Sequence, residues 1–316
     1  MSDQLTQGLL VRQPGLMTLI QDAGRFGQHG IGLTVGGPLD GDAFYWANRL
    51  CGNAGSEAAL EVSFGGLALE AQVPTLIAVT GAEMVLTING EEQPQWQSHA
   101  VKPGDEIKLA YATAGCRAYL AVKGGFAIAP SFGSAATVAR EGIGGLNGGK
   151  LVQGDLLPCA AHKDAPAYQL PESLRPTYRK SVTLRVMLGY QKETFSPVAL
   201  ARFFTSEYTT TDRSDRMGYR LEGPEVTSSI NGILSEGICH GAIQVPADGQ
   251  PIVLLNDRQT IGGYPKLGSV ISLDTAKLAQ LTPGAKVHFE EITIDDAHSL
   301  HLLHRQKRES TELISC

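Results

Sequence analysis

The chain has 316 residues, of which 42% are hydrophobic and 18% charged, and its net charge is −6. This length predicts one large or two ordinary domains, and the acidic balance argues against nucleic-acid binding because no basic surplus is present to neutralise phosphates. No run approaches the roughly 20 apolar residues of a membrane span, and the N-terminus lacks a signal-peptide pattern, so we expect a cytoplasmic protein that does not bind a membrane.

The first half predicts short strands around a single helix. Apolar runs at 9–11, 17–20, 60–62, 75–80, 83–88, 106–111 and 118–122 are typical of strands. Residues 40–51 predict a helix with Asp40 as its N-cap, because an apolar stripe follows that side chain. Asn89-Gly90 is the strongest signal for a hairpin turn in the chain.

The second half begins after a predicted linker at residues 161–181, where prolines recur and apolar residues show no sustained helical or strand periodicity. A new β pattern starts at Val182, residues 196–205 predict a helix, and residues 209–224 are interpreted as a polar loop. Asp248-Gly249 predicts a turn between two strands, and residues 274–281 a helical turn. Residues 295–316 are expected to form a tail, as a peripheral helix or a frayed end.

The two halves resemble each other in the order of their motifs. The Leu60-Glu61-Val62 run parallels Ile243-Gln244-Val245, and a Pro-Gly turn with a following strand recurs at 103–109 and 283–289. An internal repeat of this kind predicts two copies of one β-barrel. We therefore expect a mainly β fold with barrels at 1–160 and 182–294.

Several kinds of site find little support. The run from Gly144 to Lys150 has the spacing of a P-loop, but Leu151 replaces the magnesium-binding hydroxyl and no helix pattern follows. The clustered histidines lie only in the tail. The five cysteines are scattered, odd in number and without a C-x-x-C pair, which indicates reduced thiols. No metal site is predicted.

A set of carboxylate, arginine and amide side chains remains. Arginine forks suit carboxylate or phosphate groups, and a buried Asp or Glu beside them can act as a general base. The alternative is that each side chain organises its own loop, and Asp22 and Arg25 could pair with each other. The set comprises Asp22, Arg25, Asp40, Glu61, Arg213, Arg216, Arg220, Gln244, Asp257, Arg258, Gln259 and Thr260.

These residues lie in motifs that resemble the family of the 5-oxoprolinase C subunit, also called KipA and often labelled allophanate hydrolase subunit 2 or biotin-dependent carboxyltransferase-like. The resemblance covers roughly residues 9–293. Its motifs are Gln21-Asp22-x-Gly24-Arg25-x-Gly27, Leu60-Glu61, Ser214-Asp215-Arg216-Met217-Gly218, Gly241-Ala242-Ile243-Gln244-Val245-Pro246, and Gln259-Thr260-x-Gly262-Gly263-Tyr264-Pro265.

The resemblance implies two cyclophilin-like β-barrels and a complex with the KipI-like B subunit and the A subunit of 5-oxoprolinase. It implies ATP-dependent opening of 5-oxo-L-proline to L-glutamate, with ATP and Mg²⁺ held at least partly by the partners. The expected catalytic residues are Asp22, Arg25, Arg216 and Asp257. The expected substrate-binding residues are Asp40, Glu61, Arg213, Arg220, Gln244, Gln259, Thr260, Gly262, Gly263 and Tyr264.

Two alternatives stay open. A KipA-like regulator would bind and antagonise a KipI-type kinase inhibitor. A carboxyltransferase component of the urea carboxylase type would work with biotin, although the chain has no biotinyl-carrier sequence and no biotin carboxylase region.

Overall fold

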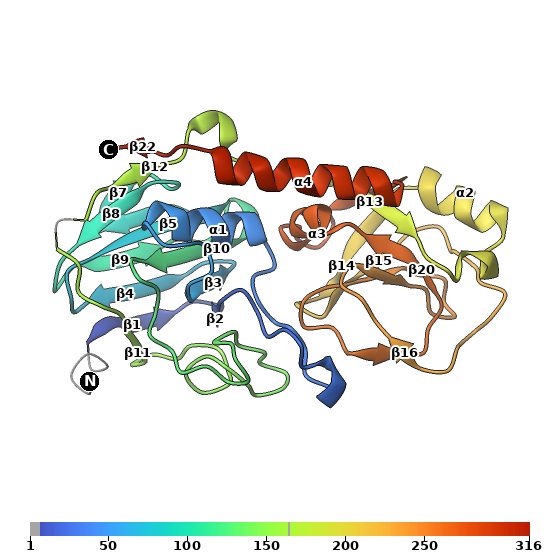
Figure 1. The fold of residues 1–316 in the computed structure, drawn as a ribbon, viewed down its shortest axis with the longest axis horizontal. Helices are drawn as coiled ribbons and strands as arrows, with labels where there is room; N and C mark the ends of the chain where they lie inside the picture. The colour runs from blue at the N-terminus through green and yellow to red at the C-terminus, as the bar shows by residue number, and fades with distance from the viewer. Residues whose placement is uncertain (1–6, 164) are drawn as a thin grey trace. The chain divides into compact units, whose positions relative to one another are not determined.

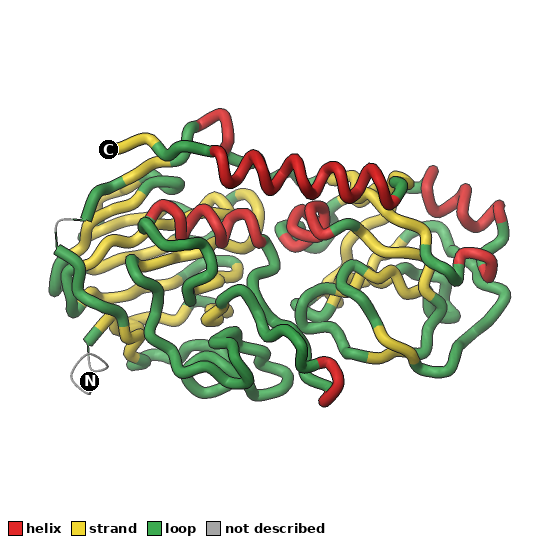
Figure 2. Tube along the Cα trace, in the orientation of Figure 1, coloured by secondary structure: helices red, strands yellow, loops and turns green. Residues whose placement is uncertain are grey.

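A computed structural model describes residues 7–163 and 165–316 (Figure 1). The chain divides into two units: one takes the residues up to Gln28, 35–178 and 312–316, and the other takes 29–34 and 179–311. Strands predominate over helices in both (Figure 2), so the expected mainly β fold is confirmed. Among the described residues, no helix is long and apolar enough to cross a bilayer.

The first unit contains two antiparallel sheets. One has the order β11-β1-β4-β9-β6-β7 and the other β2-β3-β10-β5-β8. The strands of the first sheet are β1 (Gly8–Pro14), β4 (Leu67–Ala71), β6 (Leu86–Ile88), β7 (Glu91–Gln93), β9 (Glu106–Leu109) and β11 (Leu156–Pro158). Those of the second are β2 (Met17–Gln21), β3 (Ala59–Ser63), β5 (Thr75–Glu83), β8 (Ser98–Val101) and β10 (Ala114–Val122).

A single apolar core lies between these sheets. Leu9 and Leu69 come from one sheet, Leu60 and Leu120 come from the other, and all four are fully buried. Burial at this scale is the main stabilising contribution to such a fold. The six- and five-stranded sheets therefore form the body of this unit, whereas the described residues form a closed barrel only in the second unit.

Helix α1 (Gly41–Leu50) covers the five-stranded sheet. Asp40 caps it, because its carboxylate accepts a hydrogen bond from Ala43 N at 3.0 Å, as predicted. The apolar stripe of α1 packs on Ala78 of β5 and Tyr119 of β10. The predicted Asn89-Gly90 turn is also confirmed, since it joins β6 to β7 with positive φ at both residues.

The second unit is built on a closed barrel with the order β13-β20-β17-β18-β15-β14-β21. All its strand pairs are antiparallel except β13 with β21. The strands are β13 (Ser181–Leu188), β14 (Tyr208–Ser214), β15 (Gly218–Glu222), β17 (Ala242–Gln244), β18 (Ile252–Leu254), β20 (Lys266–Val270) and β21 (Lys286–Glu291). A separate ribbon pairs β16 (Glu236–Gly237) with β19 (Ile261–Gly262).

Helices α2 (Pro197–Thr205) and α3 (Ser272–Ala279) pack on this barrel, and η2 (His29–Ile31) and η4 (Lys192–Thr194) are short 3₁₀ turns. Phe203 of α2 stacks on Phe289 with ring centroids 4.3 Å apart. The prediction of a polar loop at 209–224 is wrong, because β14 and β15 form a hairpin there. Tyr208 and Thr210 are buried on one face of β14 while the alternate residues are more exposed, which is the pattern of a half-buried strand.

The predicted linker and tail have regular structure. Residues 161–181 include β12 (Tyr168–Gln169) and η3 (Glu172–Leu174). The tail contains α4 (Ile294–Ser310), which has no buried residue, and β22 (Ile314–Ser315), which pairs with β12.

Candidate functional site

In the first unit, Glu61 of β3 is fully buried and lies in a hydrogen-bond network. Its Oε2 accepts from Tyr119 Oη at 2.7 Å and from Leu39 N at 3.0 Å. Tyr119 Oη in turn accepts from Asp40 N at 2.8 Å, and Asp40 Oδ2 accepts from Tyr178 Oη at 3.2 Å. Burial and then Glu61 raise the pKa of Tyr119, and burial and then Asp40 raise the pKa of Tyr178. The network fixes the start of α1 against the sheet.

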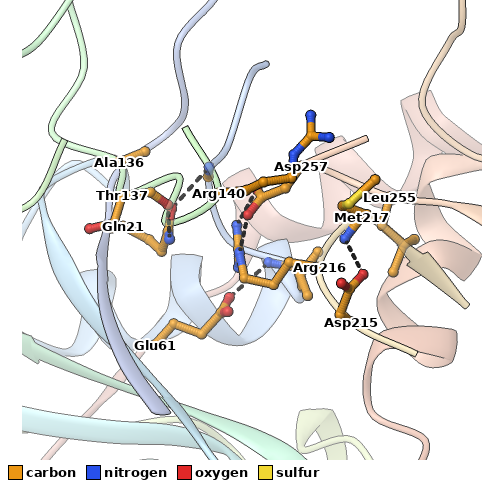
Figure 3. A network of polar contacts seen from close by, with 12 residues as sticks. Gln21, Glu61, Ala136, Thr137, Arg140, Asp215, Arg216, Met217, Leu255 and Asp257 are labelled. Atoms are coloured by element: carbon orange, nitrogen blue, oxygen red, sulfur yellow. Dashed lines mark hydrogen bonds and ion pairs between the residues drawn. The ribbon is translucent and has the colours of Figure 1, made fainter. Parts of the chain in front are cut away.

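Asp22 holds two loop segments together. Its carboxylate accepts from Gly24 N at 2.9 Å, from the Ser134 hydroxyl at 2.5 Å and from Ala135 N at 2.6 Å. Gln21 makes a parallel link, because its Nε2 donates to Thr137 O at 3.0 Å (Figure 3). These bonds tie the end of β2 to residues 134–137.

Arg25 is a fully buried cation. Its Nε donates to Ser131 O at 2.9 Å, and its Nη2 donates to Ala136 O at 3.0 Å. Nη1 has no partner among the described residues. Asp22 and Arg25 therefore bind the same segment and form no ion pair with each other.

The glycine-rich run at 144–150 is built for close backbone packing. A Cβ at Gly144 would lie 1.9 Å from Ala136 O, and one at Gly148 would lie 2.2 Å from Gly142 O. The residues directly after Lys150 form no helix, and Lys150 Nζ donates to Leu16 O at 3.5 Å. These features do not fit a P-loop, which needs a helix N-terminus and a free lysine at the phosphates.

In the second unit, Arg216 and Asp257 pair with each other (Figure 3). The guanidinium donates from Nε to Oδ2 at 2.9 Å and from Nη2 to Oδ1 at 3.0 Å, which is a bidentate geometry. Their side chains are 8% and 6% exposed. Asp215 organises the same turn, because its Oδ1 accepts from Met217 N at 2.8 Å. The structure thus brings two predicted catalytic residues together as one buried ion pair.

Arg258 is also buried, and its guanidinium donates to Ile238 O and Leu255 O, each at 3.2 Å. Burial lowers its pKa. Burial, and then the positive charge of Arg258, lower the pKa of neighbouring His240 to about 4. His240 is therefore neutral at physiological pH.

Apart from Gln244, the remaining predicted residues of this unit lie at surface or half-buried positions. Arg220 pairs with Asp248 at 3.2 Å on the surface, and Arg213 is exposed without an ion pair in the described part of the chain. Gln259, Thr260 and Gly263 are half-buried, and Tyr264 is exposed.

Gln244 is the last residue of β17 and is 1% exposed. Its Nε2 has no hydrogen-bond acceptor among the described residues. Gly262 lies against it, since a Cβ there would be 2.6 Å from Gln244 Nε2 and 2.5 Å from Ile238 Cδ1. Two predicted substrate-binding residues therefore lie side by side, and the second must be glycine for the first to keep its place.

The structure adds four residues that the sequence did not single out. Lys266 Nζ forms an ion pair with Glu236 Oε1, the Tyr190 hydroxyl donates to the same oxygen, and Gln191 Nε2 donates to it at 2.6 Å. The hydrogen bonds from Lys266 and Tyr190 hold the pKa of Glu236 below its usual value. We call Tyr190, Gln191, Glu236, Gln244 and Lys266 the Glu236 cluster. The one available sequence signal was that Glu236 and Lys266 flank the polar stretch that contains Gln244.

Among the described residues, no group of three or more His, Cys, Asp or Glu side chains is arranged to hold a metal ion. Two hollows in the surface are lined by other residues. One of about 640 Å³ is lined by Arg185, Glu290 and Asp296. One of about 390 Å³ is lined by Thr75, Ala100 and His162.

Comparisons with known proteins place this chain among carboxyltransferase-domain proteins. Residues 31–291 match the family described as carboxyltransferase domain, subdomain A and B. The chain is 35% identical to the C subunit of 5-oxoprolinase from Escherichia coli over 92% of this chain and 93% of that protein. It is 30% identical to urea amidolyase of Saccharomyces cerevisiae over 91% of this chain, which is only 17% of that protein.

A solved structure shows the same fold. The crystal structure of the Kluyveromyces lactis urea amidolyase superposes with a TM-score of 0.90 at 29% identity. The match covers 96% of this chain and 20% of that one, so this chain spans about a fifth of the larger protein.

Proposed function

Because this chain belongs to the family of the 5-oxoprolinase C subunit, which carries the carboxyltransferase domain, we propose that it is the C subunit of an ATP-dependent 5-oxoprolinase. In this proposal it acts in the cytoplasm with the A and B subunits. The complex converts 5-oxo-L-proline, ATP and water to L-glutamate, ADP and phosphate.

One observation carries this proposal. The match to the Escherichia coli protein runs through nearly the whole of both chains, 92% of this one and 93% of the other. A match to a domain of a larger enzyme would cover a small share of that enzyme, as the 17% for the yeast urea amidolyase does. The end-to-end correspondence favours a subunit of the same size and the same role.

ATP would supply the phosphoryl group that turns the stable lactam oxygen into a leaving group. The run at 144–150, which has the spacing of a P-loop, is packed closely against backbone atoms of this chain. We propose that ATP and Mg²⁺ are held at least partly by the partner subunits. This chain would contribute polar side chains that bind and orient the cyclic amide.

Purified components test the proposal. The A and B subunits are mixed with this chain, and ADP is measured with and without 5-oxo-L-proline. We expect 5-oxoproline-dependent ADP formation only when all three are present. An unchanged rate in the mixture that lacks this chain would show that it is not part of the enzyme.

A second candidate is a carboxyltransferase that works with biotin. The TM-score of 0.90 to the urea amidolyase favours it, since the superposition covers 96% of this chain. The discriminating assay offers carboxybiotin and urea to this chain with its partners. Loss of carboxybiotin that depends on both urea and this chain would support this candidate over the first.

A further inference from the structure

The Glu236 cluster is assembled by the closure of the second barrel. Gln244 ends β17 and Lys266 begins β20, and the two are partners in an antiparallel pair, next to a register shift between Ile243 and Gln244. Glu236 is in turn the register partner of Gly262, which contacts Gln244 Nε2. The end of β17, the start of β20 and the β16–β19 ribbon therefore meet at one place.

Among the described residues, hydrogen-bond donors reach only one carboxylate oxygen of Glu236. Lys266 Nζ, the Tyr190 hydroxyl and Gln191 Nε2 all donate to Oε1. Oε2 receives no donor from the described residues, and the side chain is 34% exposed. The carboxylate is thus fixed by three donors on one side and offers an acceptor on the other.

Lys266 is set to hold this carboxylate ionised and in place. Its side chain is only 10% exposed, and Nζ also donates to Gly237 O at 3.4 Å. Its backbone N donates to Gln191 Oε1 at 2.7 Å, which orients the Gln191 amide so that Nε2 faces Glu236. The buried Lys266 ammonium is bound by the Glu236 carboxylate and by Gly237 O, so it holds the carboxylate in a fixed position.

Gln244 supplies the complementary group. Its Nε2 is a donor without an acceptor among the described residues, in a side chain that is almost fully buried. Buried amides are hydrogen-bonded in the large majority of native proteins, so an unmatched donor needs a reason. Gln244 and Glu236 both adjoin Gly262, which places the unmatched donor and the unused acceptor at the same ribbon.

We propose that the Glu236 cluster binds the N–H and C=O edge of a planar cyclic amide. The ligand N–H donates to Glu236 Oε2, and the ligand carbonyl accepts from Gln244 Nε2. Tyr190, Gln191 and Lys266 are positioning residues that hold the carboxylate. The identity of the amide as a lactam rests on the proposed 5-oxoprolinase function, whereas the recognition of an amide edge rests on the two unmatched groups.

Two probe ligands isolate the role of the N–H. The full-length chain is titrated with 2-pyrrolidone, which has the N–H, and with N-methyl-2-pyrrolidone, which lacks it, while binding is followed by NMR. We expect 2-pyrrolidone to bind about tenfold more tightly, because a hydrogen bond to a charged acceptor has about that effect. Equal binding of the two probes, or binding of neither, contradicts the proposal.

Glu236→Gln tests the acceptor. The substituted amide keeps its oxygen toward the three donors, so its NH₂ takes the place of Oε2 and faces the ligand N–H. We expect the preference for 2-pyrrolidone to disappear, and Gln244→Met to weaken both probes. The matched control is Glu222→Gln, which makes the same charge change at an exposed position of β15. If Glu236→Gln keeps the preference, the proposal is wrong.

Tyr190→Phe keeps the test informative if Glu236→Gln fails to fold. Tyr190 is 75% exposed, so its loss leaves the core intact while one donor to Oε1 is removed. We expect a two- to threefold loss of 2-pyrrolidone affinity, on the order expected for a partial loss of orientation. Unchanged affinity in folded Tyr190→Phe would count against the positioning role.

The reconstituted complex separates this inference from the proposed function. If the complex hydrolyses 5-oxoproline, Glu236→Gln should raise KM about tenfold with little change in kcat. Activity with an unchanged KM overturns the cluster as the binding site and leaves the function standing. Inactivity of the complex, with probe binding that depends on Glu236, overturns the function and leaves the cluster standing.

Discussion

Arg216 and Asp257 are joined twice in the second barrel, because the side chains pair bidentately and Asp257 N also donates to Arg216 O at 2.9 Å. The pair links the β14–β15 turn to the segment after β18. Both side chains are more than nine-tenths buried, so the pair lies in a place where an ionised group needs a matching charge. Their predicted catalytic roles stay a prediction, and the pair has a structural consequence that can be measured.

Breaking this pair should destabilise the protein strongly. Arg216→Ala removes both hydrogen bonds that the guanidinium donates to the buried Asp257 carboxylate, which costs about 3–5 kcal/mol of unfolding free energy. Urea denaturation of the purified chain measures the loss. The control is Arg220→Ala, which breaks the surface pair with Asp248 in the same barrel and should cost at most about 1 kcal/mol. Equal losses in the two variants would contradict the buried-pair interpretation.

Gly262→Ala should displace Gln244. The added Cβ meets Ile238 Cδ1 at 2.5 Å and Gln244 Nε2 at 2.6 Å, so the neighbours must move at a cost of about 1–3 kcal/mol. Gly237→Ala in the facing strand of the ribbon is the control, because no described residue lies within 4 Å of its Cβ. We expect a lower Tm and weaker 2-pyrrolidone binding only for the first variant.

Tyr119→Phe tests the network at the start of α1. The change removes a donor to Glu61 Oε2 and the acceptor of Asp40 N, in a fully buried place. We expect a loss of about 1–3 kcal/mol in chemical denaturation. Tyr111→Phe, at a position 60% exposed, should change stability by no more than about 0.5 kcal/mol. A neutral Tyr119→Phe would show that the hydroxyl does not organise this loop.

His240 should make the second unit sensitive to acid. Its folded-state pKa of about 4 lies below the ordinary value of 6.5, mainly because of burial and then because of Arg258. The unfolded chain therefore binds a proton at a higher pH than the folded chain does. Stability contributed by neutral His240 is present above pH 6.5 and is lost as the pH falls from 6.5 to 4.

His240→Gln should reduce that dependence. The comparison is urea denaturation of the native chain and the variant at pH 7 and at pH 4.5. We expect the loss on acidification to be smaller in the variant by about 1–3 kcal/mol, since one linked protonation is removed. Identical losses would show that His240 is not a source of the pH dependence.

Local patterns in the sequence predicted much of the fold. The cap at Asp40, the Asn89-Gly90 turn and the short apolar strands follow from neighbours in the chain, and the structure has them. The hairpin at 208–222 was missed because threonines and charged residues occupy β14. When only hydrophobic residues are counted as strand signals, a strand whose buried face carries Thr is interpreted as a polar loop.

The sequence predicted less of the candidate site than of the fold. Arg216 and Asp257 were both recognised as polar residues in distinctive motifs, but nothing in the sequence indicated that they pair across 41 positions. No motif marks Lys266 or Tyr190, because a single lysine or tyrosine carries no signal by itself. Their convergence on Glu236 exists only after the barrel has closed and the ribbon has formed over Gln244.

The role of this chain in 5-oxoprolinase is tested by the L-glutamate formed from 5-oxo-L-proline and ATP by the A and B subunits, with and without this chain. We expect glutamate in the three-component mixture, none in the mixture that lacks this chain, and one ADP for each glutamate. Glutamate formation at the same rate without this chain would show that the C-subunit role is wrong.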